Sequence, residues 1–327
     1  MGGPQLSHQP SRNTAIEDYA VAVIIPCKNE EAAIADVVAG FRAVLPSAAI
    51  VVFDNASSDN TADVAAAAGA IVRRERNPGK GQVIRRAFAD IEADIYLMVD
   101  GDGTYDAAAA PAMVHKLLHD QLDMVVAARR HETDAAYRFG HQTGNALFST
   151  AFRLFFDPQI TDVLSGYRVF SRRFVKSFPS VAKGFEIEVE ISAHAASMRV
   201  PTDEFDVTYV DRAAGTESKL RTYRDGLRIF GSMLSFLHAH RPTVLYAPLA
   251  LAMALFSLTI GLPVVAEYFA TGLVPRFPTA IAAASIMLGA LLVGAIGIVQ
   301  RKMARYHTEQ KRLVYLSLRS ASQGPQR

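Results

Sequence analysis

The chain has 327 residues and a nearly balanced charge, with 34 Lys and Arg against 32 Asp and Glu. Hydrophobic residues make up 50% of it before Gly is counted, whereas an ordinary soluble domain reaches about 45–50% with Gly included. The apolar excess argues against a purely soluble protein, the near-neutral charge against a dedicated nucleic-acid binder, and the single Cys against a disulfide scaffold. One thiol suits a reducing, cytoplasmic compartment for the polar part.

The first 18 residues are polar and lack an apolar run. They predict a flexible tail without a signal peptide, so we expect the following domain to stay where it is made. Residues 19–218 then alternate short apolar runs with helical patterns. The runs predict strands at Val21–Pro26, Ile50–Asp54, Ala70–Arg73, Ile95–Asp100 and Met124–Ala128, and the helical patterns lie at Glu30–Leu45, Asn60–Ala68, Lys80–Ile91 and Ala108–His119. This alternation predicts a Rossmann-like α/β domain with a mostly parallel sheet, whose ligands bind beyond the carboxyl ends of the strands.

The C-terminal third carries the apolar excess. Residues 219–241 place apolar side chains at three- and four-residue spacing, which favours an amphipathic juxtamembrane helix, although such a stripe is also typical of a core helix. Residues 244–300 contain two uncharged runs, Ala247–Ala266 and Ile281–Val299, each close to the ~20 residues that span a membrane.

Basic residues flank these two predicted transmembrane helices unevenly. Arg276 is the one basic residue between the two runs, whereas Arg241 precedes the first run and a basic tail, residues 301–327, follows the second. The positive-inside rule therefore predicts a multi-pass protein of the inner (plasma) membrane, with its α/β domain and both termini cytoplasmic.

Three polar clusters follow predicted strands. Asp54 opens the stretch DNASSDNT, which is typical of a turn and helix cap but could also bind a nucleoside. Lys80 lies in NPGKG at the start of a helix, where backbone amides and positive charge favour phosphate. Asp100 and Asp102 end an apolar strand; they form either a solvated acidic turn or a site for a divalent cation carrying a diphosphate. Their order on successive strand ends favours a nucleotide-diphosphate site.

Several of these stretches resemble one family. VAVIIPCKNEE, DNASSDNT, NPGKG and VDGDGTY resemble the family 2 glycosyltransferases with the GT-A fold. TDVLSGYRVFS, GFEIEVE and DRAAGTESKL resemble the polyprenyl-phosphate branch of that family, which includes dolichol-phosphate mannose synthase. The resemblance covers Val21 to Arg241. It implies inverting transfer of one sugar from a UDP- or GDP-linked donor to a membrane polyprenyl phosphate, in the assembly of a cell-envelope glycan.

The resemblance also implies roles for individual residues on the donor side. The donor would be held by Pro26, Glu30, Asp54, Lys80 and Asp100. Asp100 and Asp102 would bind Mg²⁺ or Mn²⁺, and Asp102 would be catalytic. The family's third metal-side position, Gln in some members, is Thr104 here.

On the acceptor side the resemblance implies a group of basic residues and one hydroxyl. The phosphate of the acceptor would meet Arg129, Ser165, Arg168, Arg212 and Lys219, of which Arg129, Arg212 and Lys219 would be catalytic. Glu186 and Glu188 are interpreted as structural or substrate-orienting.

Two other functions compete with this one. A processive polysaccharide synthase shares the early motifs but needs a Q-x-x-R-W element, which a chain without Trp cannot contain. A catalytically inactive membrane scaffold or flippase partner would keep the fold, but the intact acidic and basic site residues argue against it. The sequence leaves the sugar, the nucleotide and the polyprenyl length open, and its apolar helices are compatible with a homo-oligomer.

Overall fold

The computed structural model describes residues 16–131, 160–182, 184, 186–210, 231, 234–235, 237–238, 241–320 and 324. Arg212, Lys219 and most of the predicted 219–241 helix lie outside these residues. The described chain falls into an α/β unit and a unit within Gly231–Gln310, after which the chain returns to the α/β unit at Lys311.

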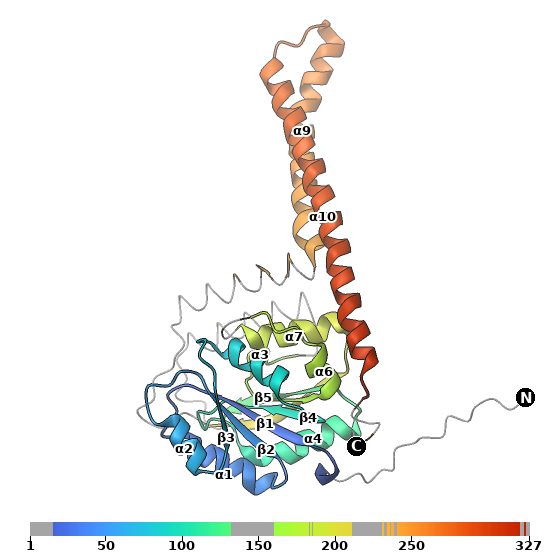
Figure 1. Cartoon of the computed structure of the whole chain (residues 1–327). Helices are drawn as coiled ribbons and strands as arrows, with labels where there is room; N and C mark the ends of the chain where they lie inside the picture. The colour runs from blue at the N-terminus through green and yellow to red at the C-terminus, as the bar shows by residue number, and fades with distance from the viewer. Residues whose placement is uncertain are drawn as a thin grey trace, which may run out of the picture. The chain divides into compact units, whose positions relative to one another are not determined.

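The α/β unit is built on one sheet of seven strands (Figure 1). In sheet order they are β3 (Ile71–Arg74), β2 (Ala49–Asp54), β1 (Val21–Cys27), β4 (Ile95–Met98), β6 (Arg168–Ser171), β5 (Met124–His131) and β7 (Thr202–Tyr209). Only β6 runs antiparallel to its neighbours among these strands. The predicted mostly parallel α/β sheet is confirmed.

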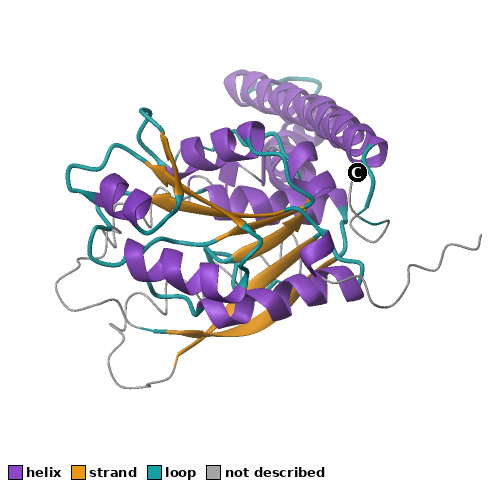
Figure 2. Ribbon diagram, turned by 60° about the horizontal axis from the view of Figure 1, so that its bottom comes forward, coloured by secondary structure: helices purple, strands orange, loops and turns teal. Residues whose placement is uncertain are grey.

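Helices cover both faces of this sheet (Figures 1 and 2). One layer holds α1 (Ile34–Val44), α2 (Thr61–Ala67) and α4 (Ala110–His119), and the other holds α3 (Lys80–Asp90), α6 (Arg172–Ser177) and α7 (Ile187–Met198). The short 3₁₀ turns η1 (Ile16–Asp18) and η2 (Ala107–Ala109) complete the unit. Because alternate side chains of a strand point to opposite faces, Val23 and Ile25 of β1 pack with Ile34 and Phe41 in one buried cluster.

Two predicted elements of the α/β unit differ from the structure by three or more residues at one end. Helix α1 begins at Ile34 rather than Glu30: residues 31–33 form a turn, and the amide of Glu30 donates to the Thr61 hydroxyl at 2.9 Å. Strand β5 continues past Ala128 to His131, because β7 pairs with it along its whole length. Strands β6 and β7 and helices α6 and α7 are additions that the sequence patterns did not predict.

Two helices are long and apolar enough to cross a membrane, α9 (Pro242–Thr271) and α10 (Phe277–Ser317), and the second unit contains α9 and α10 as far as Gln310. Small residues let their backbones approach, as in membrane helix pairs. The Ser257 hydroxyl donates to the Ala283 carbonyl at 2.8 Å, and a Cβ on Gly297 would lie only 2.7 Å from Cβ of Tyr246. Large apolar side chains stay exposed along both helices, which a buried core helix would not show.

Helix α10 extends far beyond the predicted second span. The predicted basic tail is helical as far as Ser317. No Gly or Pro interrupts residues 298–323, and Arg305 pairs with Glu309 one turn later at 2.8 Å. Continuation of the helix is therefore what the local sequence favours.

The end of α10, from Lys311 on, belongs to the α/β unit and there contacts the fully buried Asp123. Its carboxylate accepts hydrogen bonds from the Tyr315 hydroxyl at 2.6 Å, from the Ser171 hydroxyl at 2.6 Å, and from Arg173 at 2.5 and 2.7 Å. The Arg173 guanidinium also lies over the Tyr315 ring, 4.6 Å from its centroid. This buried carboxylate is fully partnered, and Tyr315 contributes to it from the end of the chain.

Candidate active site

The carboxyl ends of β1 and β2 lie side by side, with Pro26 opposite Phe53 and Cys27 opposite Asp54. Asp54 is 6% exposed, and its carboxylate accepts the amide of Ser57 at 3.2 Å. The predicted donor residues Pro26 and Asp54 are therefore neighbours at one edge of the sheet.

Asn55 connects this edge to the phosphate-type loop. Its side-chain nitrogen donates to the carbonyls of Glu75 and Asn77, at 3.2 and 2.7 Å, and its side-chain oxygen accepts the amide of Gly79 at 2.7 Å. Gly79 has φ +125°, which favours glycine, and α3 begins directly after it at Lys80. Asn55 thereby fixes the position of Lys80, a role that its place in a turn-type sequence did not reveal.

Lys80 lies between two carboxylates. Its ammonium contacts Asp100, which follows β4, and Glu188 Oε1 at 2.5 Å in the first turn of α7. Burial alone would lower the pKa of Lys80, but the two carboxylates raise it above its usual value. Burial raises the pKa of Glu188, although Lys80 partly opposes that shift. The predicted pair of Lys80 and Asp100 is thus brought together, with Glu188 as an added partner.

Gly166 and Thr104 contact the two aspartates of the DGD motif, Asp100 and Asp102. A Cβ on Gly166 would lie 2.2 Å from Asp100 Oδ2, so the backbone of the 160s loop closes directly over that carboxylate. The Asp102 carboxylate accepts the amide and the hydroxyl of Thr104, at 3.2 and 2.7 Å. Thr104 therefore orients Asp102, whether or not it also contacts a metal ion.

The oxygen ligands that Asp100 and Asp102 offer suit a metal ion that is bound together with a diphosphate. No cluster of three or more His, Cys, Asp or Glu that could hold a metal occurs among the described residues. Asp100 and Asp102 supply hard carboxylate oxygens. Mg²⁺ is typically held by one or two carboxylates, substrate phosphates and water rather than by a protein cage. These residues fit such a cation.

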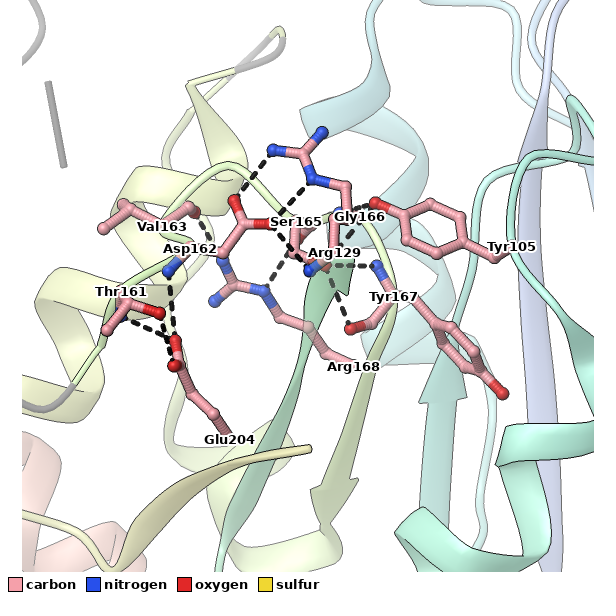
Figure 3. Close-up of polar contacts among 10 residues, drawn as sticks. All are labelled: Tyr105, Arg129, Thr161, Asp162, Val163, Ser165, Gly166, Tyr167, Arg168 and Glu204. Carbon is pink, nitrogen blue, oxygen red and sulfur yellow. Dashed lines mark hydrogen bonds and ion pairs between the residues drawn. The ribbon is translucent and has the colours of Figure 1, made fainter. Parts of the chain in front are cut away.

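Arg129 at the end of β5 forms the second ion pair of the site (Figure 3). Its Nε and Nη2 each donate to an oxygen of Asp162 at 2.7 Å. Glu204 fixes Asp162 in turn, because it accepts the backbone amides of Thr161 and Asp162 at 2.6 and 3.0 Å. Burial opposes the charged form of Arg129, but the hydrogen bonds that it donates to Asp162 raise its pKa. Sequence reasoning found Arg129 but missed the two carboxylates that hold it.

Ser165 and Arg168 are fully buried, unlike the acceptor-lining residues that were predicted. Arg168 donates to the carbonyls of Ser165 and Val163, at 3.0 and 2.6 Å, and to the Ser192 hydroxyl at 2.9 Å (Figure 3 shows the first two partners). Burial lowers its pKa to about 10. Both side chains brace the loop from inside, so direct contact with an acceptor is not what this geometry favours.

Three further predicted residues are Glu186, Arg212 and Lys219. Glu186 accepts the amide of Gly184 at 3.1 Å, which agrees with a structural role. Arg212 and Lys219 lie outside the described residues, so their predicted contact with the acceptor phosphate stays a prediction.

Known proteins are similar to this chain in sequence and in fold. Residues 22–178 match the family model of glycosyl transferase family 2. Glycosyltransferase AglJ of Haloferax volcanii is 30% identical over 297 residues, which cover 90% of this chain and 97% of AglJ. A dolichyl-phosphate hexose transferase of the same organism is 24% identical over 65% of this chain and 92% of its own.

A solved structure supports the fold. Glucosyl-3-phosphoglycerate synthase from Mycobacterium tuberculosis, crystallised with Mn²⁺, UDP-glucose and phosphoglyceric acid, has a TM-score of 0.55 at 22% identity. The match covers 67% of this chain and 79% of the synthase. The predicted GT-A fold and the enzyme class are confirmed. Because AglJ matches over nearly its full length, the chain belongs to glycosyltransferase family 2 and is a transferase with a GT-A-like domain.

Proposed function

We propose that the protein transfers one sugar, with inversion, from a UDP- or GDP-linked donor to the phosphate of a membrane polyprenyl phosphate. The observation that carries this proposal is the meeting of Lys80 and Asp100 at the strand-end edge that also holds Asp54, in a chain with two exposed apolar helices. The similarity to a dolichyl-phosphate hexose transferase supports the lipid acceptor.

On the donor side, Asp54 would bind the nucleoside together with Pro26 and Glu30. Asp100 and Asp102 would hold Mg²⁺ or Mn²⁺ on the diphosphate, with Thr104 keeping Asp102 in orientation. The related synthase has been crystallised with Mn²⁺ and UDP-glucose, and also with Mg²⁺ and UDP. When bound, such a cation neutralises the charge that gathers on the departing nucleoside diphosphate.

The acceptor needs no base. A phosphate monoester has a second pKa of about 6, so a polyprenyl phosphate is largely a dianion at neutral pH. One of its oxygens attacks the anomeric carbon while the bond from that carbon to the diphosphate oxygen breaks, and the electron pair leaves with the nucleoside diphosphate. The protein then has to supply position and positive charge. We assign these tasks to Arg129, Arg212 and Lys219, with Ser165 and Arg168 bracing the loop.

The apolar helices would place this chemistry at a membrane. The basic residues around the helices favour cytoplasmic termini, since Arg241, Arg301 and Lys302 flank them on one side. Arg276, in the connection, pairs with Glu267 at 3.0 Å. The proposed location is the inner membrane, where the lipid acceptor resides.

Transfer assays on the full chain in detergent test this function. Labelled UDP- and GDP-sugars are offered with a polyprenyl phosphate or with 3-phosphoglycerate, and products are identified by mass. We expect a polyprenyl-phosphate sugar from one donor and no phosphoglycerate product. Transfer to phosphoglycerate alone, or to neither acceptor with any donor, would overturn the proposal. An Arg212→Ala variant is expected to transfer poorly, and wild-type kinetics would remove Arg212 from the site.

A further inference from the structure

Lys80 is unusual in being shared by two acids from different parts of the fold. Its side chain is 8% exposed. Lys80 is the first residue of α3, Asp100 follows β4, and Glu188 lies in α7. The two acids differ in their access to solvent. The Asp100 side chain is 30% exposed, whereas that of Glu188 is 5% exposed. A ligand that arrives from solvent can therefore reach Asp100 more easily than Glu188.

If the proposed metal site is correct, two positively charged groups bind to the carboxylate of Asp100. It contacts the Lys80 ammonium, and it is one of the two carboxylates assigned to the divalent cation. A cation and an ammonium that share one carboxylate repel each other, strongly so in a partly buried site. The two cannot both sit on Asp100 without cost, so one must give way.

We propose that Lys80 competes with the divalent cation for the carboxylate of Asp100. When the cation displaces Lys80 from Asp100, Glu188 acts as the positioning residue that holds Lys80 beside the donor diphosphate. This inference rests on the proposed metal site. Lys80 then has two successive partners, Asp100 first and the diphosphate second, and it stays paired with Glu188 throughout. A lysine suits this role because its charge is compact and its stem is flexible.

The backbone around Glu188 supports a constant partnership. The amide of Gly81 donates to the carbonyl of Gly184 at 3.2 Å, so the start of α3 is tied to the turn that precedes α7. Lys80 and Glu188 therefore come from segments that are joined to each other, whereas Asp100 comes from the strand edge. Glu188 Oε2 is buried and has no hydrogen-bond partner in the described structure, which leaves it able to accept a second bond from the ammonium.

Binding of Mn²⁺, measured by electron paramagnetic resonance on the full-length protein, tests the competition. Without nucleotide, Lys80→Met is expected to bind Mn²⁺ at least ~10-fold more tightly than wild type, because the competing charge is gone. Glu188→Gln is expected to bind it at least ~10-fold more weakly, because Lys80 is then left to Asp100 alone. An unchanged Mn²⁺ affinity in Lys80→Met overturns the proposal.

A double variant shows whether Glu188 affects Mn²⁺ binding by holding Lys80 or through its own charge. If Glu188 acts through Lys80, adding Glu188→Gln to Lys80→Met changes nothing further. Additive effects would instead mean that Glu188 acts only through its field, and would overturn its assignment. Glu190→Gln is the matched control. Glu190 is buried on the same helix but accepts the amides of Val181 and Ala182, so its variant should bind Mn²⁺ as wild type does.

Nucleotide binding supplies the second signature. With Mn²⁺ present, calorimetry with UDP and GDP should show weaker diphosphate binding to Lys80→Met, opposite in sign to its effect on the metal alone. Asp102→Asn tests the underlying site separately. If wild type binds no Mn²⁺ with either nucleotide, or Asp102→Asn binds it equally well, the metal site fails and the inference with it. If Asp102→Asn loses Mn²⁺ while Lys80→Met binds both ligands as wild type does, only the inference fails.

Discussion

Two cationic side chains, Lys80 and the partly buried Arg129, lie in the two halves of this site, and they are held in different ways. Lys80 is shared between Asp100 and Glu188, which come from separate elements. Arg129 pairs with one carboxylate among the described residues, that of Asp162, through two hydrogen bonds of 2.7 Å, and its guanidinium also lies 5.4 Å from the centroid of the Tyr209 ring. A point charge between two acids can move toward either, whereas a planar guanidinium in a bidentate pair is fixed in direction. The first arrangement suits exchange of ligands, and the second suits positioning.

The surroundings reinforce this difference. Asp162 is fixed by Glu204 through backbone amides, so the Arg129 pair forms one rigid unit with the loop. Asp100 lies close to the same loop at Gly166. We therefore expect substitutions on the Lys80 side to alter what the site binds, and substitutions on the Arg129 side to alter how well the acceptor is placed.

The largest effect is expected from removing the second metal-side carboxylate. Asp102→Asn should lower sugar transfer by ~10³-fold or more, because charge stabilisation of the leaving group is lost. Chelation of wild-type protein with EDTA should have the same result, restored by added Mn²⁺. The control is Asp106→Asn, four residues later, where the side chain only accepts the amide of Ala108 at 2.8 Å. Full turnover in EDTA would contradict a metal-dependent donor side.

A methyl group at Gly166 should break the contact between the two halves. Gly166→Ala would place Cβ 2.2 Å from Asp100 Oδ2, so the carboxylate or the loop must shift. We expect transfer to fall ~100-fold, as a misplacement of about 1 Å can cause. Gly294→Ala is the control, because its Cβ would meet Ala250 at an ordinary 3.9 Å. Equal rates for the two variants would show that the position of Asp100 is not critical.

Replacing the planar guanidinium of Arg129 by an ammonium group tests the Arg129 half of the site. Arg129→Lys keeps the charge but loses one of the two bonds to Asp162, so we expect about a 10-fold higher KM for polyprenyl phosphate with an unchanged KM for the donor. The neighbouring Arg130, which pairs with Asp206 on the exposed surface, provides the control variant Arg130→Lys. A rise in the donor KM instead would assign Arg129 to the other half of the site.

The smallest effect concerns stability rather than binding. Tyr315→Phe removes one hydrogen bond to the buried Asp123 and should lower the free energy of unfolding by about 1 kcal/mol. Chemical unfolding of the full chain in detergent measures this change, with the exposed Tyr306 as the site of the control Tyr306→Phe. Sugar transfer by folded Tyr315→Phe should match wild type, since both halves of the site are intact. No loss of stability would mean that Arg173 and Ser171 suffice for Asp123.

Among the strands that the sequence predicted, β1, β2 and β4 have nearly all their side chains buried, whereas β3 is mostly exposed. β1 and β4 read as short apolar runs, and their parallel pairing brings the ends of successive strands to one edge. That geometry is why Lys80 and Asp100 could be expected together. β6 has only four residues and runs antiparallel, and β7 carries three acids with mixed exposure, so neither shows a clear apolar period.

The rest of the site depends on contacts between residues far apart in sequence. Nothing in the local pattern around Glu188 indicates Lys80, and nothing around Asp162 indicates Arg129. Arg168 shows the opposite failure. A basic residue in a motif was expected to face a phosphate, but the fold turns its guanidinium onto backbone carbonyls. Charge alone does not reveal which groups the fold will bury.

The return of the chain to Asp123 has a practical consequence for making the protein. Because residues 311–327 belong to the α/β unit, the apolar helices are an insertion in that unit and not an appendix to it. Shortening the chain from its C-terminus would remove Tyr315 together with the helices, and would leave a buried carboxylate with one donor fewer. A water-soluble form is better sought by cutting out the insertion and rejoining the chain ahead of Lys311.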